Sequence, residues 1–118
     1  MALNYIDWER KDVLVLSLTG RLTLGEGTKL LRRLIGDSLA LGKKNIVLKL
    51  GEVVYIDSSG LGELVAAHRA VSRQGGKLKL VKLTSRAQEL FHMSKLYTVF
   101  EIYNDEDSAV ASFESAAV

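Results

Sequence analysis

Residues 53–62 read Val53-Val54-Tyr55-Ile56-Asp57-Ser58-Ser59-Gly60-Leu61-Gly62. An apolar run is followed by an acid and two hydroxyls, and a pattern typical of a helix begins immediately afterwards. Ser58 and Ser59 therefore fall where the first backbone N–H groups of a helix lack partners within the helix. A serine there can cap the helix. It can also be a regulatory site, because phosphorylation adds about −1.5 to −2 charges at one point of the surface.

The chain on either side of this stretch alternates between strand and helix patterns. Strands are predicted at residues 5–9, 13–19, 45–50, 78–81 and 99–103, with Gly20 ending the second. Apolar residues follow helical spacing in four segments: about 27–41, from Ser58-Ser59 to Gly75-Gly76, 85 to about 93, and the segment after residue 105. Asn104 or Asp105 can cap the last of these helices.

This order predicts an α/β fold with a mixed, mostly parallel sheet, an N-terminal antiparallel hairpin that turns at residues 10–12, and about four helices. The length of 118 residues suits one domain, so residues 1–118 are expected to form a single unit. Strand-to-helix loops gather at one end of such a sheet. We therefore expect the loops at 22–28 and 51–59 to be neighbours in space.

Composition excludes several classes of protein. Hydrophobic residues make up 47% of the chain and charged residues 25%, and a net charge of +2 argues against direct nucleic-acid binding. Cysteine is absent, which excludes thiolate chemistry. The start of the chain lacks a basic segment followed by an apolar one, and no apolar run approaches the roughly 20 residues that span a bilayer. These features predict a cytoplasmic protein that does not enter a membrane.

The segment 57–60 has a surplus of capping groups. One cap needs one oxygen, yet Asp57, Ser58 and Ser59 are consecutive. Gly60 and Gly62 add a second anomaly, since each glycine in a helix costs up to about 1 kcal/mol relative to alanine. A close approach by another backbone, either the sheet's or a partner's, would explain both glycines. We interpret Asp57 as shaping the loop and Ser59 as the cap.

Catalysis by either serine is not supported. A nucleophile elbow needs glycine two residues before the serine, where Ile56 and Asp57 stand instead. His68 falls on the apolar face of its helix and is expected to be a packed histidine. No catalytic residue, metal-ligand set or cofactor is predicted.

The glycine-rich stretch Gly25-Glu26-Gly27-Thr28 follows a strand and opens a helix, as a dinucleotide fingerprint does. The match is partial, because Leu30 stands where the third glycine belongs. A tight turn with Thr28 as the helix N-cap is the better interpretation.

Taken together, the sequence resembles the STAS-domain family, and specifically the bacterial anti-sigma factor antagonists. The resemblance covers nearly the whole chain. It is carried by Gly20-Arg21-Leu22, residues 46–50, 53–62 and 75–81, Ala87-Gln88-Glu89-Leu90-Phe91-His92-Met93-Ser94-Lys95-Leu96 and Phe100-Glu101-Ile102.

The resemblance implies a binding protein without enzymatic activity. A serine kinase that is also the anti-sigma factor would phosphorylate Ser58, and a serine phosphatase would reverse the modification. The unphosphorylated form would bind the kinase and release the sigma factor. The resemblance further implies a monomer or weak dimer, and it places the partner-binding surface at Thr23, Asp57, Ser58, Ser59, Gly60, Leu61 and Gly62.

Two residues depart from the family pattern. Thr23 stands where many members carry an acid beside the switch loop, so its presence bears on recognition by the kinase. Lys95 stands where glycine is usual. If Lys95 has left-handed backbone angles, it costs about 1 kcal/mol or more.

Two other functions remain open at this point. One is a STAS scaffold subunit of a stressosome or a lipid-transport complex, without a phosphorylation switch. The other is an enzyme or a nucleotide-binding module, which only the partial glycine loop supports. The mass of the protein after incubation with kinase and ATP separates the first alternative from a switch, and calorimetry with nucleotide tests the second.

Overall fold

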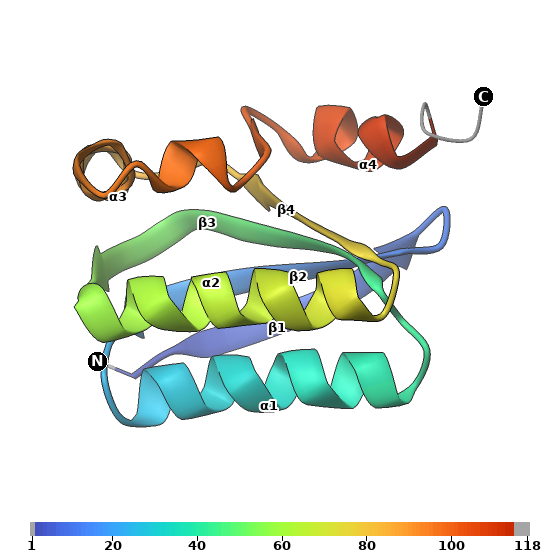
Figure 1. Ribbon diagram of the computed structural model, residues 1–118, viewed down its shortest axis with the longest axis horizontal. Helices are drawn as coiled ribbons and strands as arrows, with labels where there is room; N and C mark the ends of the chain where they lie inside the picture. The colour runs from blue at the N-terminus through green and yellow to red at the C-terminus, as the bar shows by residue number, and fades with distance from the viewer. Residues whose placement is uncertain (1, 115–118) are drawn as a thin grey trace.

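The computed structural model describes residues 2–114 and contains a five-stranded sheet in the order β1-β2-β3-β4-β5. Strand β1 runs antiparallel to β2, and all other neighbours are parallel, which confirms the predicted α/β fold (Figure 1). The strands are β1 Asn4–Arg10, β2 Val13–Leu22, β3 Asn45–Ile56, β4 Lys77–Val81 and β5 Ile102–Tyr103. The helices are α1 Glu26–Ala40, α2 Ser58–Arg73, α3 Ser85–Met93, the 3-10 turn η1 Leu96–Thr98 and α4 Glu106–Glu114.

The hairpin between β1 and β2 turns through two residues with left-handed backbone angles, Lys11 at φ 49° and Asp12 at φ 65°. Two such residues in succession match the twist of an antiparallel pair. The predicted turn at 10–12 is therefore confirmed, except that Arg10 still belongs to β1.

The main core lies on one face of the sheet, under α1, α2 and α3. Helices α1 and α2 lie side by side across this face (Figure 1). A smaller apolar cluster lies where α4 meets β2, β3 and β4, and it contains Val13, Val15, Val47, Val81, Ala109 and Val110. The first halves of β2 and β3 are thus covered on both faces, which explains why residues 13–16 and 46–48 are continuously apolar.

Helix α4 is attached through polar groups as well as through the smaller apolar cluster. The Glu106 carboxylate accepts hydrogen bonds from Trp8 Nε1 at 2.9 Å, Arg10 Nη1 at 2.9 Å and Lys49 Nζ at 3.1 Å. The nearly buried Lys79 donates to Ser112 Oγ at 2.7 Å. Asp105 is the cap of this helix, because its carboxylate accepts from the Ser108 N–H at 2.7 Å.

Two strands are longer than predicted. Gly20 does not end β2, which continues to Leu22, and Gly51 lies inside β3, which continues to Ile56. Gly20 has φ 107° and lies at a register shift between β2 and β3, as glycines in bulges do. A Cβ on Gly20 would collide with the Ala2 backbone. The predicted loop at 51–59 is therefore reduced to the single residue Asp57.

Strand β5 is shorter than the predicted 99–103. The backbone N–H groups of Val99 and Phe100 both donate to the Leu96 carbonyl, at 2.9 and 3.2 Å. They belong to the turn after η1 and cannot pair with β4. The sheet therefore gains only Ile102 and Tyr103 at this edge.

Candidate functional site

The site lies at the carboxyl end of β2 and β3, where their connections to α1 and α2 meet. The Leu24 backbone N–H donates to Asp57 Oδ2 at 3.0 Å, and the Asp57 N–H approaches the Leu22 carbonyl at 3.4 Å. The expectation that these two connections are neighbours is confirmed. One aspartate thus joins two segments that are 33 residues apart in sequence.

Asp57 is also the N-cap of α2. Its backbone is extended, with φ −98° and ψ −178°, and Oδ1 accepts the Gly60 N–H at 2.8 Å. The prediction that Ser59 is the cap is wrong. A cap must come from the last non-helical residue, and both Ser58 and Ser59 already lie within the helix.

The charge of Asp57 is stabilised by backbone donors. The hydrogen bond from the Leu24 N–H, above all, and then those from the first turn of α2 hold the pKa of its carboxyl below the ordinary value, against the opposing effect of burial. Both oxygens are engaged by these bonds. Within residues 2–114, neither serine hydroxyl has a hydrogen-bond partner.

The two serines differ in exposure. Ser58, the first residue of α2, is exposed, whereas Ser59 is half-buried. The N-terminal end of a helix carries partial positive charge and unpaired N–H groups, so it favours a nearby anion. The Ser58 hydroxyl is thus accessible to an enzyme at a position that tolerates a phosphate.

The two glycines of this segment have different surroundings. Gly60 is buried, and a Cβ there would collide with the Leu22 carbonyl and lie 3.0 Å from Ile56 Cγ2. The sheet's own backbone therefore explains Gly60. Gly62 is exposed, with nothing within 4 Å of a Cβ at that position, so the fold itself does not require glycine there. Between them, half-buried Leu61 packs against the main core.

The loop after β2 is organised by glycine and threonine. Gly25, at φ 109°, is the N-cap of α1, and Thr28 Oγ1 accepts the Gly25 N–H at 3.2 Å. The prediction of Thr28 as N-cap is therefore wrong: it lies three residues later, where its hydroxyl supplies one half of a capping box, and glycine has no side chain to supply the other half. The carbonyl of half-buried Thr23 accepts the Thr28 N–H at 3.1 Å, and a Cβ on Gly27 would lie 2.7 Å from the Arg21 carbonyl.

Sequence reasoning missed one feature of this edge. Arg21 and Tyr55 are paired in register between β2 and β3, and the Arg21 guanidinium carbon lies 5.7 Å from the centre of the Tyr55 ring. Arg86, near the start of α3, lies 6.0 Å from the same ring. Leu24, beside Asp57, is 76% exposed. The signal available in the sequence was Tyr55, an aromatic residue two positions before Asp57 at the end of a predicted apolar run.

The histidines pack against aromatic rings. Half-buried His68 meets Phe100 edge-on at 5.2 Å, which confirms its prediction as a packed residue, and His92 stacks on Tyr97 at 5.5 Å. Within residues 2–114, no group of three or more acidic or histidine side chains is arranged to hold a metal ion. In the same part of the chain, none of the helices combines the length and apolarity needed to cross a membrane.

A family model for the STAS domain matches residues 6–109. Among curated proteins, the putative anti-sigma factor antagonist BtrV of Bordetella bronchiseptica is 31% identical over 75 residues, which cover 64% of this chain and 65% of the relative. The anti-sigma-B factor antagonist of Bacillus subtilis is 38% identical over 61 residues, 52% of this chain and 56% of the relative. The chain thus matches less than two thirds of the length of these two relatives.

Solved structures are similar over more of the chain. The crystal structure of a putative anti-sigma factor antagonist from Thermotoga maritima has a TM-score of 0.85 and 26% identity, and the match covers 92% of each chain. The Bacillus cell fate determinant SpoIIAA in its phosphorylated form has a TM-score of 0.73 and covers 93% of this chain and 99% of its own. At 19% identity, that likeness concerns the fold alone.

Proposed function

The chain belongs to the STAS-domain family, and we propose that it is an anti-sigma factor antagonist controlled by phosphorylation of Ser58. In this proposal residues 1–118 form one STAS domain that acts in the cytoplasm by binding proteins, without catalysis and without direct contact to nucleic acid. The unphosphorylated form binds an anti-sigma factor that is also a serine kinase, and the sigma factor is released. A serine phosphatase restores the active form.

The observation that carries the proposal is the division of roles between Asp57 and Ser58. Asp57 caps α2 and fixes the loop after β2, so the helix does not need the Ser58 hydroxyl. Ser58 is exposed at the first position of the helix, and its hydroxyl has no hydrogen-bond partner within residues 2–114. Such a serine is a suitable site for phosphorylation by a kinase. The names of the curated relatives support the same function.

Phosphorylation would act through the interface and leave the fold in place. The start of α2 accommodates the added charge through its dipole and its free N–H groups. Within a packed interface, the same dianion must be desolvated and is repelled by acidic groups of the partner. The modified protein therefore keeps its structure and loses its partner.

The remaining residues of the proposed interface surround Ser58. Thr23 and Asp57 shape the loop that borders it, and Ser59 and Leu61 belong to the first turn of α2. Exposed Gly62 presents backbone where a side chain would otherwise stand, and buried Gly60 lets the start of α2 lie against the Leu22 carbonyl. The protein acts as a monomer or weak dimer, so that this surface stays available to the kinase.

The test of the switch is phosphorylation followed by binding. Incubation with the cognate kinase and ATP should add one phosphate to the wild type and to Ser59→Ala, and none to Ser58→Ala, by intact-mass measurement. Ser58→Asp should keep a normal circular dichroism spectrum and lose affinity for the kinase. The switch is refuted if Ser58→Asp binds as tightly as Ser58→Ala. An unchanged mass with every candidate kinase would favour a scaffold subunit instead.

A further inference from the structure

The edge that carries Ser58 also carries a cluster of exposed basic and apolar side chains, which we call the arginine–tyrosine surface: Arg21, Leu24, Tyr55 and Arg86. Leu24 is 76% and Tyr55 44% exposed, and both arginines are exposed. The residues come from four segments, namely β2, the loop after it, β3 and α3. Tyrosine and arginine are enriched in protein interfaces and in the residues that dominate binding energy.

In the described part of the chain, residues 2–114, the two arginines of this surface form no ion pair. Arg10 and Arg32 form ion pairs, Arg10 with Glu106 at 2.9 Å and Arg32 with Glu63 at 2.8 Å. The guanidinium groups of Arg21 and Arg86 instead lie over the Tyr55 ring, Arg21 at 5.7 Å and Arg86 at 6.0 Å from its centre. A ring whose centre lies within about 6 Å of two guanidinium groups attracts both through cation–π interactions.

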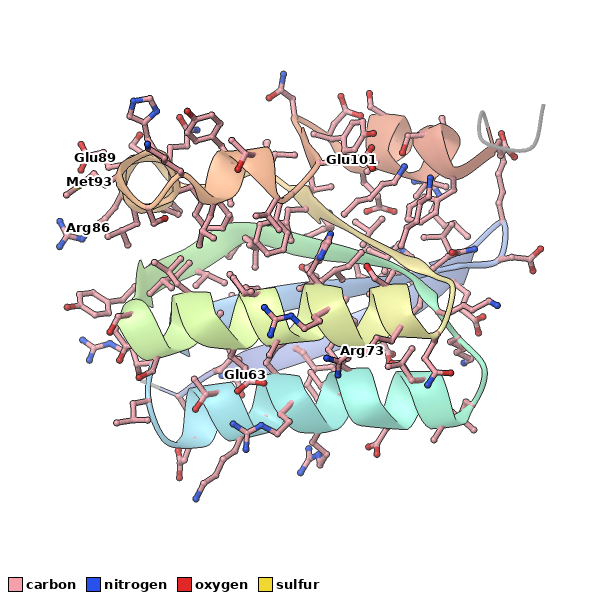
Figure 2. The ribbon with its side chains drawn as sticks, in the orientation of Figure 1. Glu63, Arg73, Arg86, Glu89, Met93 and Glu101 are labelled. Carbon is pink, nitrogen blue, oxygen red and sulfur yellow. The ribbon has the colours of Figure 1, made fainter. Side chains whose placement is uncertain are left out.

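The acids near this surface are few. The Asp57 carboxylate is engaged by backbone N–H groups. Glu26 lies exposed in the first turn of α1. Glu89 follows Arg86 on α3, and Figure 2 shows both side chains projecting from that helix at the end of the molecule where α2 begins. The starts of α1, α2 and α3 add partial positive charge to the same edge.

We propose that the arginine–tyrosine surface binds an acidic face of the anti-sigma factor. Carboxylates of the partner pair with Arg21 and Arg86, and an apolar part of the partner covers Leu24 and Tyr55. Arginine is suited to this role because its planar group binds a carboxylate through two parallel hydrogen bonds. The inference rests on the proposed function, and it adds the chemistry of the partner's contact surface.

The direction of the proposed switch favours an acidic partner face over a basic one. A phosphate on Ser58 would repel an acidic face and would also weaken the positive field of the two arginines. A basic partner face would be attracted by the same phosphate, and phosphorylation would then strengthen binding. A basic face therefore disagrees with a switch that turns binding off, whereas an acidic face agrees with it, and the two arginines have the sign that matches an acidic face.

The test measures association rates with the purified cognate kinase at several salt concentrations. Arg21→Glu and Arg86→Glu should each reduce the association rate on the order of tenfold at low salt, and the double variant should bind with a weaker dependence on salt. Glu89→Lys should bind faster than the wild type. Arg73→Glu is the matched control. Arg73 is exposed at the far end of α2, about 22 Å from Ser58 at a rise of about 1.5 Å per residue (Figure 2). The association rate of this variant should stay within about twofold of the wild-type rate.

The possible outcomes separate this inference from the proposed function. If the wild type binds, Ser58→Asp does not, and both arginine variants associate at the rate of Arg73→Glu, the acidic face is refuted while the switch stands. Faster association of the arginine variants would indicate a basic partner and also refute it. If the unphosphorylated wild type fails to bind the kinase, the proposed function and this inference both fall. Arg21→Gln and Arg86→Gln, checked by thermal unfolding, replace any charge-reversal variant that does not fold.

Discussion

Asp57 holds Leu24 in place. One carboxylate oxygen accepts the Leu24 N–H at 3.0 Å, while the other accepts the Gly60 N–H at 2.8 Å. A single side chain thus ends β3, starts α2 and fixes the loop that leads to α1. Because these hydrogen bonds fix both the loop and the helix start, the position of Ser58 depends on Asp57 more than on any other side chain of the segment.

Asp57→Ala should lower the free energy of unfolding by about 1–3 kcal/mol, because it removes a helix cap and leaves the Leu24 N–H without its acceptor. Urea denaturation measures this change. Ser59→Ala is the control, since Ser59 neither caps α2 nor has a hydrogen-bond partner for its hydroxyl within residues 2–114. A loss of stability in Ser59→Ala equal to that in Asp57→Ala would contradict the assignment of the cap.

The lowered pKa of Asp57 makes stability depend on pH. The folded protein binds a proton at this carboxyl less tightly than the unfolded chain does. The contribution of the ionised Asp57 to the free energy of unfolding is therefore fully present above the unfolded pKa of about 4, and it is lost as the pH falls through the lower pKa of the folded state. Asp57→Asn should therefore differ most from the wild type at neutral pH and least in acid. Urea midpoints from pH 7 to pH 2.5 measure the difference, and a constant gap would refute the linkage.

The sequence was sufficient to predict the order of elements because the apolar periodicities are strong and most connections are short. It was not sufficient to predict where β2 and β3 end. A glycine indicates either a turn or an irregularity within a strand, and only tertiary neighbours decide between them. For Gly20 the neighbour is the Ala2 backbone, and for Gly51 it is the Lys82 side chain.

At the site, the sequence was sufficient to identify the segment 57–60 but not to assign the caps correctly. Several residue types can cap a helix, so the assignment depends on which residue has the last extended backbone, and the sequence does not specify that. The arginine–tyrosine surface could not be predicted from the sequence for a different reason. It requires the register that pairs Arg21 with Tyr55 and the placement of α3, both of which are tertiary facts.

Glu106 should be the main polar attachment of α4. Burial raises the pKa of its carboxyl. The hydrogen bonds from Trp8, Arg10 and Lys49 together lower this pKa by more, so it lies below its ordinary value. Glu106→Gln should reduce the free energy of unfolding by about 1–3 kcal/mol. Asp107→Asn is the control, because its side chain is 86% exposed and its ion pair with Arg10 should be worth less than about 1 kcal/mol. Equal losses in urea denaturation would argue against this role.

Lys95 follows α3 with left-handed backbone angles, φ 60° and ψ 18°. This conformation is unfavourable for residues with a Cβ and is the usual place of glycine after a helix. Lys95→Gly should raise the free energy of unfolding by about 1 kcal/mol, whereas Lys95→Ala should leave it nearly unchanged. Thermal and urea unfolding of the two variants measure these changes. An equal rise in the free energy of unfolding in both would indicate that the lost lysine charge, and not the backbone conformation, is responsible.

Gly60 and Gly62 should respond in opposite ways to a single methyl group. Gly60→Ala should lose about 1–3 kcal/mol of unfolding free energy, because the added carbon collides with the Leu22 carbonyl. Gly62→Ala should gain up to about 1 kcal/mol, since the position is open and alanine favours the helix. If a partner's backbone approaches Gly62, the same variant should bind the kinase on the order of tenfold more weakly despite its greater stability. Calorimetric titration beside urea denaturation measures both, and unchanged affinity in a stabilised Gly62→Ala would remove Gly62 from the interface.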